Sequence, residues 1–245
     1  MGSYLKWITG GIGWAMGGPI GGILGFFIGS LIGSNDNQNI NGNSSSQKGK
    51  TRSGDFTVSL LILSASIMKA DGKILKSELD YVKSFLRRQF DEEKVAEMLL
   101  VLRDLLKQDY NLQEVCAQIR ANMDYSTKLH LLHFLFEIAG ADNDFNPSEI
   151  NLINDISGYL GIKSHDFESL KSMFLKTDAL EDAYKILEID SNADNDALKK
   201  AYRRMALKYH PDKVIHLGEE YQKSANEKFQ QVNDSYEKIK KHRGI

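Results

Sequence analysis

The residues best suited to chemistry lie near the carboxy-terminal end of the chain, where a histidine and an aspartate flank a proline. His210, Pro211 and Asp212 directly follow a basic helical pattern at residues 197–209. A histidine beside a carboxylate suits general acid–base catalysis. The neighbouring residues, however, add no nucleophile, no metal-binding cluster and no oxyanion donor. The sequence therefore predicts no catalytic residue, no metal ligand and no cofactor, and we do not expect an enzyme.

The bend at this tripeptide is instead predicted to display two polar side chains. Pro211 pushes His210 out of the α region and ends the preceding helix. On the outer face of that helix, cationic side chains follow one another with no acid before the bend: Lys199, Lys200, Arg203, Arg204 and Lys208. Charge runs are often only solvated surface, but one sign of charge beside a rigid bend predicts salt-sensitive docking to an acidic partner. Nucleic acid is not the predicted partner, because the aromatic residues of this helix point to the core and the segment is nearly neutral.

A second motif with chemical potential occurs twice in the middle of the chain. Residues 60–85 and 131–156 match in register, and each contains an apolar helical pattern, a turn, and a second helical pattern. The matched turn residues are Asp71 with Asp142, Gly72 with Asn143, Ile74 with Phe145, and Glu78 with Glu149. Asp, Asn and Gly favour turns and tolerate the left-handed conformation. The repeat therefore predicts two related helical hairpins.

The spacing of these acids is close to that of a calcium-binding loop. Placing Gly72 at the sixth loop position brings Glu78 to position twelve. Positions one and three then fall on Ile67 and Lys69, which supply no oxygen ligand. We therefore predict that the turn caps helices rather than binding calcium. A loosely held cation in another geometry stays open at three acids of the second copy: Asp142, Asp144 and Glu149.

The soluble part of the chain is predicted to be all-α. Prolines occur only at positions 19, 147 and 211, and alternating β-branched runs are scarce. Amphipathic helical patterns fill residues 56–176, which we expect to form one helical domain. Asn146 and Pro147 suit the first positions of a helix. The single cysteine, Cys116, lies in a helical pattern and is predicted to be a small core residue.

The carboxy-terminal residues 180–245 predict three further helices. Asp194 is placed to cap the second, whose apolar positions are Leu198, Ala201, Tyr202, Met205 and Tyr209. The third helix repeats apolar residues at alternating spacings of four and three: Tyr221, Ala225, Phe229, Val232, Tyr236 and Ile239. Such a seam predicts that the second and third helices pack as an antiparallel pair, with the bend between them.

The amino-terminal residues 1–33 carry a different signal. Residues 7–33 are uncharged, and glycine recurs at every fourth position: Gly13, Gly17, Gly21, Gly25, Gly29 and Gly33. As a helix this run would reach about 40 Å, beyond the hydrocarbon thickness of about 30 Å. A glycine ladder also lets two helices approach closely within a membrane. We therefore predict a transmembrane anchor that pairs with a second copy in a homodimer.

Alternatives to a paired anchor fit the sequence less well. A cleaved signal peptide would have a shorter apolar core and a clear small-residue cleavage site. A phosphate-binding loop needs a Lys-Ser/Thr pair after the glycines, and none is present. Glycine tolerated without any helix pairing is the alternative to self-association. Residues 34–55 are polar and predict a flexible linker, whose Lys48, Lys50 and Arg52 mildly favour a cytoplasmic side.

The carboxy-terminal segment resembles the J domain, the module that activates DnaK-type chaperones. The resemblance rests on Tyr184 and Leu187, on KKAYRRMALKYHPDK at residues 199–213, and on KFQQVNDSYEKI at residues 228–239. It implies a chaperone-docking face formed by Lys199, Tyr202, Arg203, Arg204, His210, Pro211 and Asp212. His210 and Asp212 would be needed to stimulate ATP hydrolysis by the partner. It also implies four core residues: Tyr184, Leu187, Tyr209 and Phe229.

Residues 56–176 resemble the TerB-like tellurite-resistance domain, a helical module with the same repeated Asp-centred turn. The order of anchor, TerB-like domain and J domain is similar to that of membrane-anchored DnaJ-like co-chaperones. It implies a protein of the bacterial inner membrane whose domains lie in the cytoplasm, where a DnaK-type chaperone and ATP are found. The alternative is a membrane stress-signalling scaffold whose TerB-like domain binds a regulator or a cation.

Overall fold

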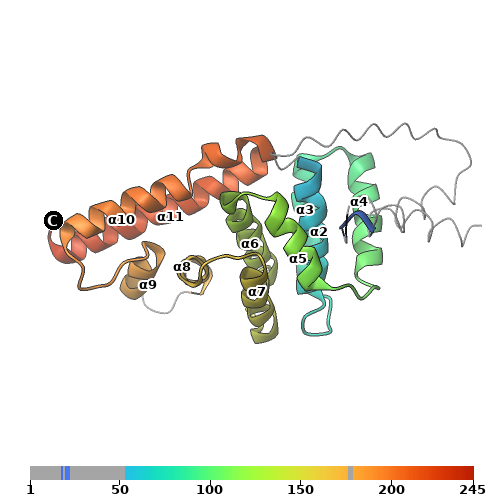
Figure 1. Ribbon diagram of the computed structural model, residues 1–245, viewed down its shortest axis with the longest axis horizontal. Coiled ribbons are helices and arrows are strands. Elements are labelled where there is room, and N and C mark those ends of the chain that lie inside the picture. The colour runs from blue at the N-terminus through green and yellow to red at the C-terminus, as the bar shows by residue number, and fades with distance from the viewer. Residues whose placement is uncertain (1–17, 19, 23–52, 176–178) are drawn as a thin grey trace, which may run out of the picture.

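The computed structural model describes residues 18, 20–22, 53–175 and 179–245, and within these ranges it confirms an all-α fold without strands. The first domain contains α2 (Ser53–Met68), α3 (Lys76–Gln89), α4 (Glu92–Leu105), α5 (Leu112–Asn122), α6 (Tyr125–Ala139), α7 (Pro147–Tyr159) and α8 (Ser164–Phe174). The second contains α9 (Ala179–Ile186), α10 (Asn195–Lys208), the 3₁₀ helix η1 (Pro211–Leu217) and α11 (Glu219–Arg243). Figure 1 shows α10 and α11 side by side, extending away from the first domain.

The predicted membrane anchor lies almost wholly outside the described residues. Of its glycine ladder only Gly21 is described, in a helical conformation. Near it, the backbone N–H of Ile20 donates a 2.9 Å hydrogen bond to Oε1 of Gln118 on α5. The other five ladder positions fall outside: Gly13, Gly17, Gly25, Gly29 and Gly33. None of the helices that the structure describes is both long and apolar enough to cross a membrane.

The two repeated segments fold into the predicted hairpins, α2–α3 and α6–α7. In each turn the aspartate accepts a hydrogen bond from the backbone N–H two residues on, at 2.8 Å in the first copy and 3.0 Å in the second. The residue after the aspartate has a positive φ in both copies, 79° at Gly72 and 64° at Asn143. Asn146 caps α7 by accepting a 2.9 Å hydrogen bond from the N–H of Ser148. The turn-and-cap prediction is therefore confirmed.

Helices α2 and α6 form the centre of the first domain. Both are apolar on nearly every side, and a helix of that kind has to be covered all round. Leu60 to Leu63 on α2 are buried, as are Leu129 to Leu132 on α6. Other helices of the domain, α4, α5 and α7, pack against α2. Cys116 on α5 is fully buried, and burial raises the pKa of its thiol to about 12, which confirms its predicted place in the core.

The second domain is built on the predicted antiparallel pair, α10 with α11 (Figure 1). Asp194 caps α10 by accepting a 2.7 Å hydrogen bond from the N–H of Ala197. The rings of Tyr202 and Tyr236 stack with centroids 4.3 Å apart. The hydroxyl of Tyr202 donates a 3.0 Å hydrogen bond to Oδ1 of Asn233. These contacts fix the register between the two helices beside the predicted bend.

The seam of α11 departs from the prediction at Phe229, whereas Tyr236, which is also half-buried, packs against the core. Phe229, expected in the core, is only half-buried, and its ring lies 5.8 Å from that of His210. The residue before it, Lys228, is fully buried instead. With about 3.6 residues per turn, positions 228 and 229 both follow Ala225 by roughly one turn. The ammonium group of Lys228 faces the first domain, 2.9 Å from Nδ1 of His130 on α6, which leaves Phe229 beside the bend.

Helix α11 connects the two ends of the molecule. It runs without interruption for 25 residues. At its start the ring of Tyr221 packs edge-on against Phe85 of α3, with centroids 5.1 Å apart. At its end Arg243 donates hydrogen bonds to the carbonyl oxygens of Ala193 and Ser191, at 2.7 and 3.0 Å. One helix thus holds both the first domain and the loop before α10.

Candidate functional site

The predicted bend at His210, Pro211 and Asp212, called the corner below, lies on the surface between α10 and η1. Tyr209 before it is fully buried, and His210 has an extended ψ of 129°, as expected before proline. The side chain of His210 is 43% exposed and that of Asp212 is 79% exposed. Nδ1 of His210 accepts a 3.3 Å hydrogen bond from the backbone N–H of Asp212. The corner therefore presents both side chains to solvent in a fixed arrangement.

Two apolar side chains near the corner are also exposed. Leu207 on α10 is 66% exposed and Ile215 on η1 is 59% exposed. Single exposed apolar residues are common on protein surfaces. Here they lie on the two elements that meet at the corner, so the surface offers apolar contacts as well as charge to a docked partner.

The structure divides the predicted cationic stripe of α10 into two parts. Lys199, Lys200 and Arg203 are exposed and form no ion pair with the residues that the structure describes. Arg204 and Lys208 turn towards the end of α9 instead. Tyr202, which the J-domain resemblance placed on the docking face, is half-buried. The docking role of all these residues stays a prediction.

Arg204 caps the carboxyl end of α9 through its side chain. Its Nη2 donates hydrogen bonds to the carbonyl oxygens of Leu187 and Glu188, at 3.2 and 3.1 Å. Glu188 has a φ of 54°, a left-handed conformation that ends the helix. The last carbonyl groups of a helix have no partner within it. Arg204 satisfies two carbonyls here while half of its side chain stays exposed.

Lys208, two residues before His210, makes a contact between the two domains. Its ammonium group contacts Asp166 on α8 and donates a 2.5 Å hydrogen bond to Oε1 of Glu188. Asp166 also accepts a hydrogen bond from the hydroxyl of Tyr125 at the start of α6. Tyr125 in turn accepts a 3.0 Å hydrogen bond from the backbone N–H of Lys163. This predicted docking residue is therefore held in a network between the domains.

The same network contains the one group of described side chains with the spacing to share a metal ion: His165, Asp166 and Glu188. The ammonium group of Lys208 already contacts both carboxylates and supplies the positive charge that they need. Burial raises the pKa of Glu188 to about 7, against the opposing effect of nearby cations. The group is therefore accounted for as an ion-pair network.

A separate cluster of acids lies where the two hairpin turns meet. The side-chain amide of Asn146 donates a 3.1 Å hydrogen bond to Oδ2 of Asp71 in the other copy. Glu78 and Glu149 are both buried beneath these turns. Oε1 of Glu78 is buried and has no hydrogen-bond partner among the described residues. Burial raises the pKa of Glu149 to about 7, and the negative charges of Glu78 and Asp71 add to this effect.

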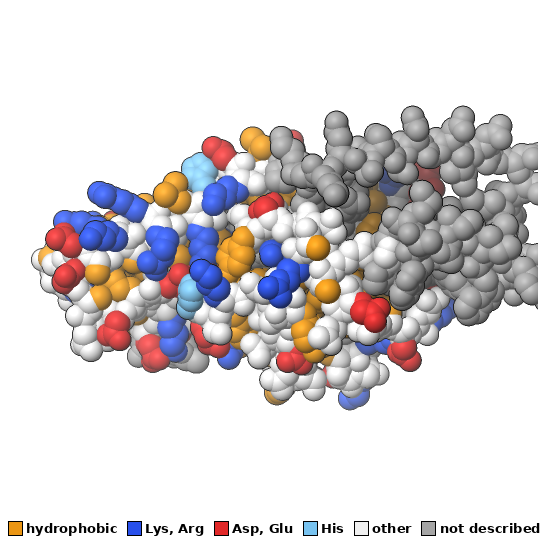
Figure 2. Space-filling model, viewed as in Figure 1, with side chains coloured by type: hydrophobic (Ala, Val, Ile, Leu, Met, Phe, Trp, Pro, Cys, Tyr) orange, Lys and Arg blue, Asp and Glu red, His pale blue; other side chains and the backbone are white. Residues whose placement is uncertain are grey.

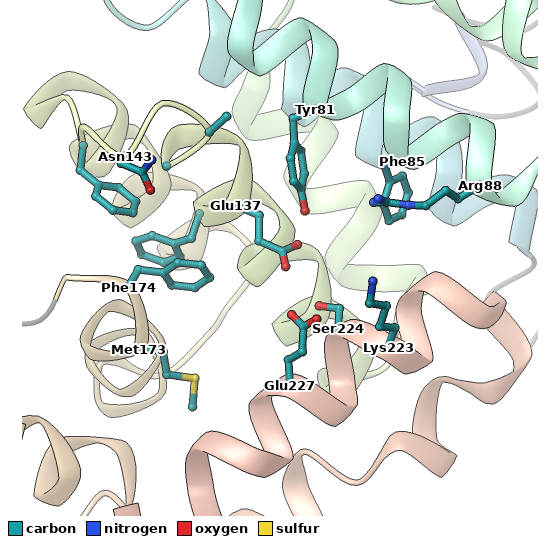
Figure 3. A pocket seen from close by; sticks show the side chains of 14 residues that line it. Tyr81, Phe85, Arg88, Glu137, Asn143, Met173, Phe174, Lys223, Ser224 and Glu227 are labelled. Atoms are coloured by element: carbon teal, nitrogen blue, oxygen red, sulfur yellow. The ribbon is translucent and has the colours of Figure 1, made fainter. Parts of the chain in front are cut away.

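A cavity of about 590 Å³ lies between the first domain and α11 (Figure 3). Its apolar side includes Phe136 and Phe174, whose rings stack 5.2 Å apart. Figure 3 shows the side chains of Tyr81, Glu137 and Glu227 pointing towards one another across its centre. Both domains thus contribute to its walls, and no motif in the sequence predicted it.

Two polar side chains at the domain junction were missed from the sequence. Lys228 had a usable signal, because it lies three residues after Ala225 and four before Val232, on the seam of α11. Asp166 had no such signal in the sequence, because acidic residues are common in the first turn of helices. Its partner Lys208 belongs to another domain, so spacing along the chain says nothing about their contact.

Two family models match the chain, in the order of its two domains. Residues 57–172 match TerB, the tellurite resistance protein TerB, and residues 182–243 match the DnaJ domain. With the corner exposed between two packed helices, these matches define the class. The chain is a J-domain protein in which a TerB domain precedes the J domain.

DjlA co-chaperones are among the proteins to which this chain is similar over most of its length. The chain is 28% identical over 234 residues to co-chaperone protein DjlA of Vibrio vulnificus strain CMCP6, covering 79% of this chain and 80% of the relative. It is 25% identical over 224 residues to that of Coxiella burnetii, covering 83% of each. Its J domain is 44% identical over 59 residues to chaperone protein DnaJ of Fusobacterium nucleatum subsp. polymorphum, covering 24% of this chain and 15% of that protein. No solved structure matches. This chain is thus a DnaJ-type co-chaperone and a homologue of DjlA over about 80% of its length.

Proposed function

We propose that this co-chaperone docks on a DnaK-type chaperone and stimulates its ATP hydrolysis, without catalysing a reaction itself. The observation that carries the proposal is the exposure of His210 and Asp212 at a rigid corner beside the cationic face of α10. Complementary charge steers a partner and fixes its orientation. The J domain and the DjlA homologues imply that this partner is a DnaK-type chaperone.

The corner and the cationic face have different roles in this proposal. Lys199, Lys200 and Arg203 attract an acidic surface of the chaperone and set the association rate, which falls as salt screens the charges. His210 and Asp212 then contact the chaperone and bring about the change that speeds hydrolysis. Hydrolysis itself takes place in the partner's active site.

A steady-state ATPase assay with a DnaK-type chaperone tests the proposal. The His210→Gln variant is expected to lose most of the stimulation, because glutamine keeps a polar side chain but not the ring. His242→Gln is the matched control, since His242 is exposed near the end of α11. Stimulation by His210→Gln equal to that of the control would contradict the proposed function.

We also propose that the chain is anchored in the inner membrane with both domains in the cytoplasm. The support is the uncharged run of residues 7–33 with its glycine ladder. A reporter fused after Ile245 is expected to be active in the cytoplasm, and periplasmic activity would refute the orientation. Pairing of anchors predicts that Gly21→Leu with Gly25→Leu weakens self-association in a membrane dimerisation assay. An unchanged signal would refute the homodimer.

Cation binding by the TerB domain is a second candidate function, favoured by one observation. Oε1 of Glu78 is buried without a hydrogen-bond partner among the described residues, at the meeting point of two acidic turns. Calcium and magnesium take carboxylate oxygens as ligands. The turn acids do not have the spacing of a formed metal site among the described residues, so binding would draw their carboxylates together. A bound divalent cation would then satisfy this oxygen and offset the negative charges that add to the effect of burial on the pKa of Glu149.

Calorimetric titration with CaCl₂ and with MgCl₂ tests this second function. Saturable binding by the wild type that is lost in Glu78→Gln is the expected result. Glu92→Gln, in the exposed first turn of α4, is the matched control and is expected to bind as the wild type does. Equal heats for the wild type and Glu78→Gln would exclude a cation site at the turns.

A further inference from the structure

The cationic surface of the J domain continues onto the TerB domain. Lys163 immediately precedes α8, with its side chain exposed. It lies three residues before Asp166, which contacts Lys208 of α10. Within the part of the chain that the structure describes, the ammonium group of Lys163 has no ion-pair partner, so its charge is available at the surface.

Arg120 adds a second exposed cation beside Gly161, two residues before Lys163. A Cβ atom on Gly161 would lie only 2.9 Å from Nε of Arg120, so this glycine leaves the room in which the guanidinium group lies. Gly161 also has a φ of +70°, which favours glycine. Arg120 on α5 is therefore held over the turn that leads to Lys163.

The two parts of this surface are fixed relative to each other. The ammonium group of Lys208 joins Asp166 of the TerB domain to Glu188 of the J domain. The hydroxyl of Ser126 at the start of α6 donates a 3.4 Å hydrogen bond to the carbonyl oxygen of Lys208. A buried ion pair with such supporting hydrogen bonds holds one geometry well.

The pKa of His165 shows that Lys163 and Lys208 lie close to the same side chain. After burial, the positive charges of Lys208 and Lys163 are the main effects that lower the pKa of His165. Figure 2 shows Lys and Arg side chains in a band along α10 that continues over the middle of the molecule.

We propose that the TerB domain takes part in docking: Lys163 and Arg120 extend the cationic face of α10, so that both domains contact the acidic surface of one chaperone. This inference rests on the proposed function. It names the TerB residues that would make the docking surface of this chain larger than that of a J domain alone. It also gives the network at Lys208 a role, which is to align the two parts.

Charge-reversal variants of the full chain test the inference in the same ATPase assay. Lys163→Glu and Arg120→Glu are each expected to raise the chaperone concentration for half-maximal stimulation by about three- to tenfold at low salt, as for the loss of a favourable charge pair. The effect should shrink as salt is added. Lys107→Glu, after α4 on a part of the TerB domain that does not touch α10, is the matched control.

Each outcome of this experiment has a defined meaning. If His210→Gln abolishes stimulation while Lys163→Glu and Arg120→Glu behave like Lys107→Glu, the extended surface is refuted and the proposed function stands. If the wild type does not stimulate at all, the proposed function fails first. Unchanged stimulation with reduced co-sedimentation on phosphatidylglycerol vesicles would assign the band to a membrane surface and overturn the inference.

Discussion

Two ionisable side chains at the junction between the domains, Lys228 and His133, are buried. Lys228 is fully buried, and burial lowers its pKa to about 7. His133 lies beside it on α6, 3.2 Å from the hydroxyl of Ser224 and 3.5 Å from Glu137. Burial of a charge is costly unless it is paired. The junction is therefore a place where protonation and folding are linked.

Stability should fall in acid because of His133. Burial, followed by the charge of Lys228, lowers the pKa of His133 from 6.5 to about 4. Between these two values the unfolded chain binds a proton that the folded chain does not, so unfolding becomes easier as pH falls. The contribution lost between pH 7 and pH 4 is about 2 to 3 kcal/mol. Urea unfolding at several pH values measures it.

The variant His133→Gln isolates this contribution. Its free energy of unfolding should depend less on pH between 7 and 4, by about 2 to 3 kcal/mol. His242→Gln, which changes an exposed histidine, is expected to keep the slope of the wild type. Identical slopes in both variants would show that His133 does not titrate in this range.

At the scale of elements, the repeated turn shows what a single glycine can decide. Gly140 ends α6 just before the second acidic turn. A Cβ atom there would lie 2.6 Å from Cζ of Phe145. The ring of Phe145 in turn packs edge-on against Phe174, with centroids 6.3 Å apart. The close approach of α6 to the turn thus depends on the absence of a side chain at position 140.

Two glycine-to-alanine variants should change stability in opposite directions. Gly140→Ala forces Phe145 to move and is expected to cost about 1 to 3 kcal/mol. Gly158→Ala lies in α7 with nothing within 4 Å of the added Cβ, and it should gain about 0.5 to 1 kcal/mol from helix propensity. Thermal and urea unfolding of both variants checks the pair. A stabilising Gly140→Ala would mean that the turn is looser than described.

The elements themselves were largely predictable, because their signals are local. The caps at Asp194 and Asn146, the end of α10 before Pro211, and the paired hairpins all follow from residue types at short spacing. Phe229 was misplaced because a helical seam with spacings of three and four permits two neighbouring positions. What decided between them was Lys228, whose partner His130 is on another domain.

At the scale of the whole molecule, the junction between the domains could not be predicted from the sequence. The contacts of Lys208 with Asp166, of Lys228 with His130 and of Tyr221 with Phe85 join residues far apart in the chain. Local periodicity carries no information on such pairs. The corner could be predicted, because its residues are consecutive, but the TerB residues beside it could not.

The junction predicts that the two domains unfold together. Tyr221 is buried against Phe85, and Tyr221→Ala should cost about 3 kcal/mol through the cavity it leaves. Calorimetry of the wild type is expected to show one transition, whereas the variant should show two. Tyr159→Ala, at a partly exposed position of α7, is the control and should keep one transition. A single, merely shifted transition for Tyr221→Ala would contradict this coupling.

The unbroken length of α11 has a mechanical consequence. At about 1.5 Å per residue its 25 residues form a rod of roughly 38 Å. One end packs against Phe85 of the TerB domain through Tyr221, and the other end is held by the hydrogen bond of Arg243 to the carbonyl oxygen of Ala193. A rotation of the TerB domain would therefore tilt α11. The tilt would change the angle at which His210, Pro211 and Asp212 face a bound partner.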